Sequence, residues 1–560
     1  MKKTTGAKIF AELIQGYGIS HVFFVPQVAS KALVAMEGMN IRRVVAHSEK
    51  AAAYMADGYA RARGGPGVCM AQPIGASNLA SGLRDAYMAH SPVIAISGGP
   101  APSSRYRHAY QEVEDFVQFD PVTKSNVCVD EPSRLPDMFR QAFRTATSGS
   151  PGPVHLRFQG RLSDVPLGET DAEALVEPQF SRVPAFRPEP EAQRVLEAVK
   201  VLSQASRPII IAGGGVHTSQ AQSEVVELAQ KLNIPVATSP NGKGVILDTN
   251  ALSVGVVGTY SRECGNRAVS EADLVFFIGC PAGGMVTANW SIIKAGTKVI
   301  QLDIEPTELG RNYPNTVSLH GDAKVTLQRM IAAAKAGEPT DKTWVPHVKQ
   351  MVADWRAQAA PKLNSDAIPI RPERICKEIT DALPENGVLV ADTGHAGMWT
   401  SQMVDFKHLG QRYIRCAGSL GWGLPGAMGV KCALPDRPVL LFTGDGGMYY
   451  HMTELETALR YGINLVILVN NNGALSQEYP SLNRNYEGNM HGQSDELWRF
   501  SEFNFAKVAE SMGCAGIRVN DPKEIGGALK KAFAMNKPVV VEVLSDVKVM
   551  APTAWVPQAS

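Results

Sequence analysis

An aspartate in a glycine-rich turn and an asparagine farther along the chain form the strongest chemical signal in the sequence. The turn Gly444-Asp445-Gly446 directly follows the apolar run Val439–Phe442, and Asn472 follows the next apolar run. If both runs are parallel strands, their carboxyl ends lie side by side, where open α/β sheets bind ligands. The carboxylate of Asp445 and the carboxamide of Asn472 supply oxygen ligands, which suit Mg²⁺ or Ca²⁺ rather than zinc.

The glycines of this turn add a place for an anion. Backbone N–H groups around Gly446 and Gly447 could cradle phosphate oxygens, as at other glycine-rich turns between a strand and a helix. A Gly-Asp-Gly tripeptide alone is more often only a tight turn. Its position between two apolar strands, with Asn472 after the second strand, is far more specific. The pattern therefore predicts a metal-bound diphosphate.

Composition and charge argue against several classes of protein. The 560 residues are 44% hydrophobic and 19% charged, which predicts large buried cores, and the length leaves room for roughly three or four domains. A formal net charge of +1 argues against nucleic-acid and membrane-surface partners. The eight cysteines are scattered without a CxxC pair, and the N-terminus has no apolar signal segment, so we expect a cytoplasmic protein with reduced thiols. No uncharged apolar run is long enough to span a membrane.

Strand and helix patterns alternate along the whole chain, which predicts an α/β fold with three doubly wound parallel sheets. The expected domains cover residues 1–165, 191–340 and 369–545. Between them we expect an exposed, proline-rich linker over 164–190 and a second connection over about 341–368. The C-terminal tail, 546–560, is expected to be mobile or to form a lid.

Helices are predicted over Gly6–Tyr17 and Glu49–Arg63. The predicted strands are His21–Val25, Val93–Ile96, Val154–Leu156, Pro208–Ala212, Leu274–Ile278, Lys298–Leu302, Val388–Ala391, Val439–Phe442, Leu465–Val469 and Val539–Val543.

Glu49 stands where an apolar strand passes into a helix. A glutamate in the first helical turn ordinarily complements the helix dipole. Here it is followed by the segment from Met55 to Arg61 (MADGYAR), and after a strand by GASNLASGLRDAYMAHSPVIAISG. Together with the Asp445 and Asn472 motifs, this order resembles the thiamine diphosphate (ThDP) enzymes. Within them it resembles the group of acetolactate synthase, benzaldehyde lyase and oxalyl-CoA decarboxylase, and most closely acetolactate synthase large subunits.

The resemblance covers about residues 5–545 and implies the order of the three domains. Residues 1–165 match the pyrimidine-binding domain, residues 191–340 the central FAD- or nucleotide-like domain, and residues 369–545 the diphosphate-binding domain. In this family Mg²⁺ is held at positions that correspond to Asp445, Asn472 and the main-chain carbonyl of Ala474. Ser48 stands where the family often has histidine.

The resemblance gives Glu49 a catalytic role. In the family, a glutamate hydrogen-bonds N1′ of the cofactor's aminopyrimidine and favours the imino tautomer, whose 4′-nitrogen then takes the proton from C2 of the thiazolium. A buried carboxyl with a raised pKa suits such proton sharing. By position, Leu420 is the wedge that bends the cofactor, and Gly418 offers a carbonyl to the 4′-amino group. His395 and Ala396 match a segment that contacts the diphosphate, although His395 is equally compatible with a surface position.

Two motifs point to the substrate side. His108-Ala-Tyr-Gln-Glu112 and Pro121-Val-Thr-Lys124 resemble a motif pair of acetolactate synthases, which implies that Gln111 lies near the reacting thiazolium. A carboxamide there could hydrogen-bond an oxygen of the adduct. No His-His pair of the pyruvate decarboxylase type occurs near residue 110, which weakens a simple decarboxylase interpretation.

Two loops depart from the family pattern. Gln72-Pro73-Ile74-Gly75 replaces the usual Gly-Pro-Gly, and Pro26-Gln27-Val28 replaces Pro-Gly-Gly. Both lie where family members line the reaction pocket. We therefore expect Gln27, Val28, Gln72 and Ile74 to shape the substrate pocket.

The central domain gives a weaker signal. Ala212-Gly-Gly-Gly215 after a strand is a weak nucleotide motif, and Asp303-Ile-Glu-Pro306 matches a family signature better. The arginine-containing Gly-Ala-Arg-Phe-Asp-Asp-Arg segment of FAD-binding members is replaced by the run Gly279 to Met285, which removes candidate phosphate partners. FAD is therefore not favoured. Another adenine nucleotide and an empty structural domain stay open.

The resemblance implies a ThDP- and Mg²⁺-dependent enzyme that makes or breaks a C–C bond beside the carbonyl of a 2-oxo acid or aldehyde, through a C2 ylide and an enamine. Acetolactate synthase-like carboligation is the first expectation. The open alternatives are a lyase or decarboxylase of the benzaldehyde lyase or oxalyl-CoA decarboxylase type, an FAD-dependent 2-oxo acid oxidase, and an inactive paralogue. Family sites form between subunits, so a homodimer is the minimum assembly and a homotetramer is expected.

Overall fold

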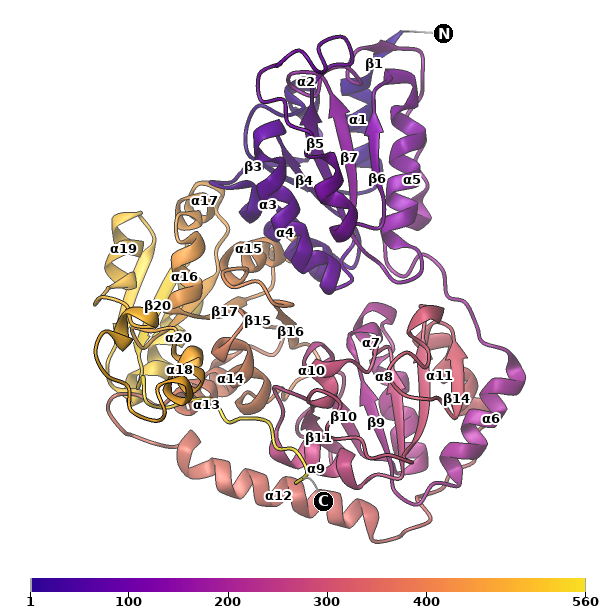
Figure 1. The fold of residues 1–560 in the computed structure, drawn as a ribbon, viewed down its shortest axis with the longest axis vertical. Coiled ribbons are helices and arrows are strands. Elements are labelled where there is room, and N and C mark those ends of the chain that lie inside the picture. The colour runs from indigo at the N-terminus through magenta and orange to yellow at the C-terminus, as the bar shows by residue number, and fades with distance from the viewer. Residues whose placement is uncertain (1–2, 559–560) are drawn as a thin grey trace.

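The computed structural model describes residues 3–558 and has three lobes, each built on a six-stranded parallel sheet (Figure 1). This confirms the predicted three-sheet α/β class. The central strands, such as β5, β9, β12, β17 and β18, are almost wholly buried and mostly apolar, as expected where helices cover both faces of a parallel sheet. No helix within residues 3–558 is long and apolar enough to cross a membrane.

The first sheet has the strand order β3-β2-β4-β5-β7-β6, and a short antiparallel pair, β1 and β8, lies apart from it. Its helix α3 begins at Glu49 because the Ser48 hydroxyl accepts a hydrogen bond from Ala51 N (3.1 Å), and it ends where Gly64 adopts a positive φ of 69°. The elements of this domain are β1 (Thr4–Thr5), α1 (Gly6–Gly16), β2 (His21–Phe24), α2 (Ser30–Ala35), β3 (Arg42–Val45), α3 (Glu49–Arg63), β4 (Gly67–Ala71), α4 (Ala76–Met88), β5 (Val93–Gly99), β6 (Asn126–Val129), α5 (Leu135–Thr147), β7 (Val154–Gln159) and β8 (Glu169–Thr170).

The second sheet has the order β11-β10-β9-β12-β13-β14. Its elements are α6 (Ala192–Ser203), β9 (Pro208–Ala212), α7 (Gly214–Ser219), α8 (Gln222–Leu232), β10 (Val236–Thr238), β11 (Ser253–Val256), α9 (Glu263–Glu271), β12 (Leu274–Ile278), α10 (Gly284–Thr287), β13 (Lys298–Asp303), β14 (Val317–His320) and α11 (Ala323–Ala333).

The third sheet has the order β16-β15-β17-β18-β20-β19. Its elements are α13 (Pro372–Ala382), β15 (Val388–Ala391), α14 (His395–Met403), β16 (Arg412–Arg415), α15 (Gly423–Ala433), β17 (Val439–Gly444), α16 (Asp445–His451), α17 (Glu454–Tyr461), β18 (Val466–Asn471), α18 (Tyr479–Asn485), α19 (Phe505–Ser511), β19 (Ala515–Val519), α20 (Ile525–Ala534) and β20 (Val539–Leu544).

The first and third domains share one hydrophobic core, because α3 packs directly on α15. Glycines allow the two helix backbones to approach closely. A Cβ at Gly58 would lie 2.0 Å from the carbonyl oxygen of Gly426, and a Cβ at Gly429 would lie 1.9 Å from that of Met55. A side chain at either position would force the helices apart, so the relative placement of the two domains depends on these residues.

Two connecting segments are more ordered than the sequence suggests. The expected linker 164–190 supplies β8 and buries Phe180 in the core of the first domain. The expected connection 341–368 contains α12 (Trp344–Leu363), whose Val345 and Val348 are buried against the second domain. Apolar residues spaced along these polar segments find partners only in the folded chain, which explains the difference.

The C-terminal tail runs as an extended segment from the third domain toward α9 of the second (Figure 1). Gln402 Nε2 donates to the carbonyl oxygen of Pro552 (3.1 Å), and Asn266 Nδ2 donates to that of Trp555 (2.9 Å). The guanidinium of Arg267 lies 4.9 Å from the centre of the Trp555 ring. The tail therefore bridges two domains up to residue 558, and the last two residues of the expected lid lie outside the described residues.

Candidate active site

Four neighbouring strands deliver the predicted cofactor residues to one edge of the third sheet. β16, β15, β17 and β18 lie side by side in that order and are all parallel. The chain passes from β15 to β16 on one side and from β17 to β18 on the other. The boundary between β15 and β17 is therefore the topological switch point, where open sheets bind ligands. The loops after these strands carry, in the same order, Gly418 with Leu420, His395 with Ala396, Asp445, and Asn472.

Asp445 and the loop after β18 are joined directly. Gly444 and Asn470 are partners in the strand register, so the two chains leave the sheet together. The Asp445 carboxylate is only 3% exposed, and its Oδ2 accepts a hydrogen bond from the backbone N–H of Ala474 (3.1 Å). Burial raises the pKa of Asp445 to about 6, against the lowering effect of hydrogen bonds from Gly446 and Ala474. A cation beside this carboxylate would offset the cost of burying its charge.

The two asparagines at the end of β18, Asn471 and Asn472, make different contacts. Asn471 Nδ2 donates to Oε1 of the buried Glu542 (2.7 Å), and Asn471 Oδ1 accepts from Gly473 N (3.1 Å), so this side chain holds the loop. Asn472 Nδ2 donates to Ser476 Oγ (3.0 Å), but Asn472 Oδ1 is buried and has no hydrogen-bond partner. A buried oxygen without a partner is costly, and a hard cation satisfies it. The donor set of Asp445, Asn472 and the Ala474 carbonyl therefore fits Mg²⁺.

Ser476 links Asn472 to the loop after β15. Its Oγ lies 2.9 Å from Nδ1 of His395. The Asn472 amide nitrogen donates to this hydroxyl, which can either donate to the histidine ring or accept from it. Burial lowers the pKa of His395 to about 4, so the ring is neutral. Sequence reasoning missed Ser476, whose only signal is its place four residues after Asn472.

The glycine turn after β17 is tight on one side and open on the other. A Cβ at Gly446 would lie 2.5 Å from a methyl carbon of Leu475, and one at Gly447 would lie 2.7 Å from Asp392 Oδ2. A Cβ at Gly444 would meet nothing within 4 Å. The turn therefore packs against the protein at Gly446 and Gly447 and leaves room beside Gly444, as a phosphate cradle requires.

Asp392 ties the switch point together, and sequence reasoning missed it as well. Its buried carboxylate accepts hydrogen bonds from Gly421 N and Gly423 N (both 3.2 Å) and from Thr443 Oγ1 (3.2 Å). Burial raises the pKa of this carboxyl to about 6. These contacts join β15 and β17 to the loop that carries Gly418 and Leu420. In that loop Gly418 is exposed and Leu420 is half-buried.

A second group of predicted residues gathers at one end of the first sheet. Glu49 is 9% exposed, and its Oε2 accepts a hydrogen bond from Asn78 Nδ2 (3.1 Å). A Cβ at Gly75 would lie 2.4 Å from Glu49 Oε1, so the loop after β4 is pressed against the carboxyl. Asn78 lies in the GASN run but was not singled out from the sequence.

The predicted pocket residues divide between this group and the core. Gln111 Oε1 accepts from Ile74 N (3.3 Å), and Gln111 Nε2 donates to Gln72 Oε1 (3.2 Å), so these three residues form one wall near Glu49. Gln27 is exposed and adopts a positive φ of 71°. Val28 is fully buried in the core of the first domain, so of this pair only Gln27 presents a side chain at the surface.

Glu49 and Gln111 form no bond to the proposed metal ligands in the single chain. Among residues 3–558, no hydrogen bond or ion pair joins Glu49 or Gln111 to Asp445 or Asn472, although His47 N, beside Glu49, donates to Glu454 Oε1 of α17 (2.9 Å). The same part of the chain contains no cluster of three or more His, Cys, Asp or Glu side chains arranged for a metal. The candidate metal site has one carboxylate only and draws its other oxygens from an amide and the backbone.

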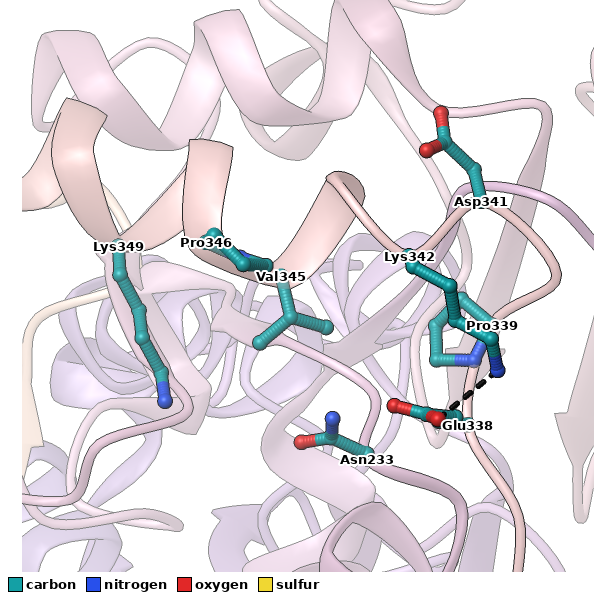
Figure 2. Close-up of a pocket in the computed structure, with 8 residues that line it drawn as sticks. All are labelled: Asn233, Glu338, Pro339, Asp341, Lys342, Val345, Pro346 and Lys349. Atoms are coloured by element: carbon teal, nitrogen blue, oxygen red, sulfur yellow. Dashed lines mark ion pairs between the residues drawn. The ribbon is translucent and has the colours of Figure 1, made fainter.

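The glycine motif of the central domain is closed by its own chain. Gly213 N donates to Ile278 O (2.8 Å), and Gly215 N donates to Gly279 O (3.0 Å), so these N–H groups are occupied. A surface hollow of about 160 Å³ elsewhere in this domain lies between Asn233 and α12, beside the ion pair of Glu338 and Lys342 (2.9 Å) (Figure 2). None of the predicted site residues lines it.

Comparison with known proteins identifies related domains along the chain. The thiamine pyrophosphate enzyme N-terminal TPP binding domain matches residues 4–119, the central domain matches residues 195–330, and the C-terminal TPP binding domain matches residues 392–543.

Full-length relatives agree with these domain matches. The chain is 34% identical to the probable acetolactate synthase large subunit of Methanocaldococcus jannaschii, over 97% of this chain and 92% of that protein. It is 29% identical to the acetolactate synthase large subunit of Haemophilus influenzae, over 98% and 95% of the two chains. It is 31% identical to the glyoxylate carboligase of Escherichia coli O157:H7, over 95% and 92%. With all three domains present in order, the chain belongs to the thiamine pyrophosphate (thiamine diphosphate) enzymes.

Proposed function

We propose that this chain is a ThDP- and Mg²⁺-dependent carboligase that joins the carbonyl carbon of a 2-oxo acid donor to a second 2-oxo acid or aldehyde. The observation that carries the proposal is the unpartnered, buried Asn472 Oδ1 on the loop hydrogen-bonded to the buried Asp445 carboxylate. Similarity to acetolactate synthases and to a glyoxylate carboligase supports carboligation and small 2-oxo acid substrates such as pyruvate and glyoxylate.

The third domain would hold the cofactor. Asp445, Asn472 and the Ala474 carbonyl bind Mg²⁺, and the metal anchors the diphosphate. The turn Gly444 to Gly447 and the loop at His395 and Ala396 would hold the diphosphate, with His395 as a neutral side chain. Gly418 and Leu420 lie against the aminopyrimidine end. ThDP, when bound, supplies a nucleophilic carbon that adds to the donor's carbonyl group.

The first domain would supply the proton chemistry and the pocket. Glu49 holds a proton against the pyrimidine nitrogen, and Asn78 fixes the orientation of its carboxyl through the 3.1 Å hydrogen bond. Gln111, braced by Ile74 N and Gln72, hydrogen-bonds an oxygen of the bound substrate. Gln27, Gln72 and Ile74 restrict the space for donor and acceptor.

A homodimer is part of the proposal, and a homotetramer is its expected form. Glu49 and Asp445 form no hydrogen bond with each other among residues 3–558, and the proposal takes Glu49 from one copy and the Asp445 loop from another. The loop around Gln111 supports this assembly because it exposes Tyr106, Tyr110 and Val113, which are 74%, 79% and 56% accessible in the single chain. A cytoplasmic location, also proposed, is supported by eight free cysteines.

The test is product analysis with the purified full chain. The protein is incubated with ThDP, Mg²⁺ and single or paired 2-oxo acids and aldehydes, and the products are identified by mass spectrometry. We expect a hydroxy-oxo acid longer than the donor, together with CO₂, only when both ThDP and Mg²⁺ are present. Release of an aldehyde without ligation would instead indicate a decarboxylase, and turnover without ThDP would refute the proposal.

A variant pair separates catalysis from folding. Glu49→Gln is expected to lower kcat by about 100-fold or more, since it removes the ionisable proton carrier and keeps the side-chain shape. Glu12→Gln, on the outer surface of α1, is the matched control and retains normal activity. Near-normal turnover of Glu49→Gln would remove Glu49 from its proposed role.

A further inference from the structure

The loop that carries Gly418 and Leu420 is attached to the first domain by a buried carboxylate. Asp85, on α4, is fully buried and lies at the boundary of the two domains. Its Oδ1 accepts a hydrogen bond from Ala417 N, and its Oδ2 accepts hydrogen bonds from Gly418 N and Ser419 N, each 2.9 Å long. Three successive N–H groups that converge on one carboxylate fix the path of the backbone through all three residues.

Arg61, on α3, neutralises this carboxylate and holds the start of the same loop. Its guanidinium donates to Asp85 Oδ1 (2.9 Å) and to the carbonyl oxygen of Arg415 (2.6 Å). Burial alone would raise the pKa of Asp85, but Arg61 and the backbone N–H groups outweigh it and hold the pKa below its ordinary value. The carboxylate is therefore charged and fully paired, which is the condition for a stable buried ion.

The other end of the loop is held by the same helix. Trp422 Nε1 donates to Asp57 Oδ2 (2.8 Å), and the Arg61 guanidinium lies 4.7 Å from the centre of the Trp422 ring. Asp57 in turn accepts from Arg61 Nε (2.8 Å). Residues 416–422, here called the 416–422 loop, are thus anchored at both ends and in the middle by side chains of α3 and α4.

Within its own domain the loop is anchored near its two ends, and at the start Cys416 N donates to Ala391 O (2.9 Å). Asp392 accepts from Gly421 N, near the end of the loop, at 3.2 Å. Gly418 is exposed, and a Cβ there would meet only the terminal carbon of Met88, at 3.5 Å. The position of Gly418 and of the half-buried Leu420 therefore depends on Asp85.

We propose that Asp85 is a positioning residue, whose carboxylate, paired with Arg61, sets the 416–422 loop so that the Gly418 carbonyl and Leu420 meet the aminopyrimidine end of the cofactor. This inference rests on the proposed function. Asp85 itself touches neither substrate nor cofactor and acts through the loop. In this proposal Asp85 and the 416–422 loop belong to the same chain, whereas the Glu49 of the same active site comes from the other copy.

The test uses Asp85→Asn in the full chain. The matched control is Asp137→Asn in the first turn of α5, which likewise removes a carboxylate paired with an arginine (Arg134 Nη2, 2.9 Å) but lies far from residues 417–419 in the sequence. The asparagine keeps the shape but loses the charge, and its amide group faces backbone donors. Hydrogen–deuterium exchange is measured on the cofactor-free protein. We expect faster exchange of the amides at residues 417–419 in Asp85→Asn only, while peptides of the second domain are unchanged. Unchanged exchange at 417–419 would overturn the proposal.

Kinetics supply the second readout. In the proposed carboligation assay, Asp85→Asn is expected to lower kcat by about 10- to 100-fold with little change in KM, because the loop contacts the cofactor rather than the substrate. Faster loop exchange with normal kcat would also overturn the proposal. Should Asp85→Asn not fold, Asp85→Glu replaces it, because it keeps the charge that pairs with Arg61 and moves the carboxylate oxygens away from the N–H groups of residues 417–419. Unchanged exchange at residues 417–419, or faster exchange with normal kcat, then overturns the proposal.

The proposed function and the role proposed for Asp85 can be refuted independently. If the wild-type chain does not bind ThDP with Mg²⁺ in calorimetry, the proposed function is wrong. The exchange experiment on the cofactor-free protein still shows whether Asp85 fixes the loop. If the wild type is an active carboligase and Asp85→Asn matches the control in both readouts, only the role of Asp85 is wrong.

Discussion

Ser476 Oγ lies 2.9 Å from Nδ1 of His395, and this contact joins the loops that follow β15 and β18. The same oxygen accepts from Asn472 Nδ2 (3.0 Å), so one hydroxyl orients both the proposed metal ligand and the proposed diphosphate donor. The orientation of Asn472 matters because its Nδ2 bonds to Ser476 and leaves the buried Oδ1, which has no hydrogen-bond partner, for a cation. Ser476 is therefore a link between the two halves of the cofactor site.

Ser476→Ala is predicted to weaken cofactor binding without unfolding the chain. Loss of these hydrogen bonds frees both partners to rotate, so the Kd for ThDP in saturating Mg²⁺ should rise about 3- to 10-fold. Isothermal titration calorimetry measures this change. Ser511→Ala is the matched control, since that exposed hydroxyl bonds only to Lys507 O of its own helix. Equal affinity of Ser476→Ala and the control would show that the link is dispensable.

The two asparagines after β18 should give opposite results. Asn472→Ala removes the buried oxygen that lacks a partner, so the melting temperature of the cofactor-free protein is expected to hold or rise while Mg²⁺-dependent ThDP binding is lost. Asn471→Ala removes the 2.7 Å hydrogen bond to the fully buried Glu542. This change should lower the free energy of unfolding by about 1–3 kcal/mol. Thermal unfolding and calorimetry on both variants test the contrast. A stability loss in Asn472→Ala larger than in Asn471→Ala would contradict the proposed division of work.

Gly75 is predicted to be essential for activity because a side chain there would clash with Glu49. The backbone conformation of Gly75 does not itself require glycine. Its φ of −84° is open to any residue, but an added Cβ would lie 2.4 Å from Glu49 Oε1. Gly75→Ala should therefore displace the carboxyl and lower kcat by about tenfold or more. Ser77→Ala, an exposed change at the start of α4, is the control.

A double-mutant cycle identifies the cause. In a Glu49→Ala background the clash partner is gone, so Gly75→Ala should cost little further melting temperature. If Gly75→Ala destabilises the Glu49→Ala protein as much as the wild type, the clash lies elsewhere.

The sequence predicted best those features that local patterns determine. The bounds of α3 follow from the Ser48 cap and the positive φ of Gly64, and the strand Pro208–Ala212 is a fully apolar run; both were predicted to the residue. β16 was missed because it reads Arg-Tyr-Ile-Arg, and its terminal arginines are buried by partners from other domains. No local pattern reveals such partners.

The residues of the candidate site also divide into those that local sequence patterns indicate and those that depend on distant partners. Asp445, Asn472 and Glu49 stand at strand ends and so carry a positional signal in the sequence. Asp85, Asp392 and Ser476 act through contacts with distant segments, and in the sequence each is an ordinary polar residue of a helix or loop. The residues proposed to bind carry a signal in the sequence, whereas most of those proposed to position them do not.

His217 gives a pH prediction that is independent of the active site. Its Nε2 lies 3.1 Å from the carbonyl oxygen of Lys243, and Gln222 Nε2 donates to its Nδ1 (3.1 Å), so the ring is held as a neutral tautomer. Burial lowers its pKa from 6.5 to about 4, with a further lowering from the charge of Arg412. The unfolded chain binds the proton below pH 6.5, while the folded protein binds it only near pH 4. The stability that His217 contributes is therefore present above pH 6.5 and is lost as the pH falls from 6.5 to 4.

The measurement is the difference in melting temperature between the wild type and His217→Gln from pH 7.5 to pH 4.5. Glutamine keeps polar contacts but does not titrate, so the wild type should lose its advantage over the variant as the pH falls. Taking a difference cancels buried carboxyls such as Asp303 and Asp392, whose pKa values, raised to about 6, act in the opposite direction. His491→Gln, an exposed change, should track the wild type at every pH. A constant difference between wild type and His217→Gln across this range would show that His217 is not held neutral by the fold.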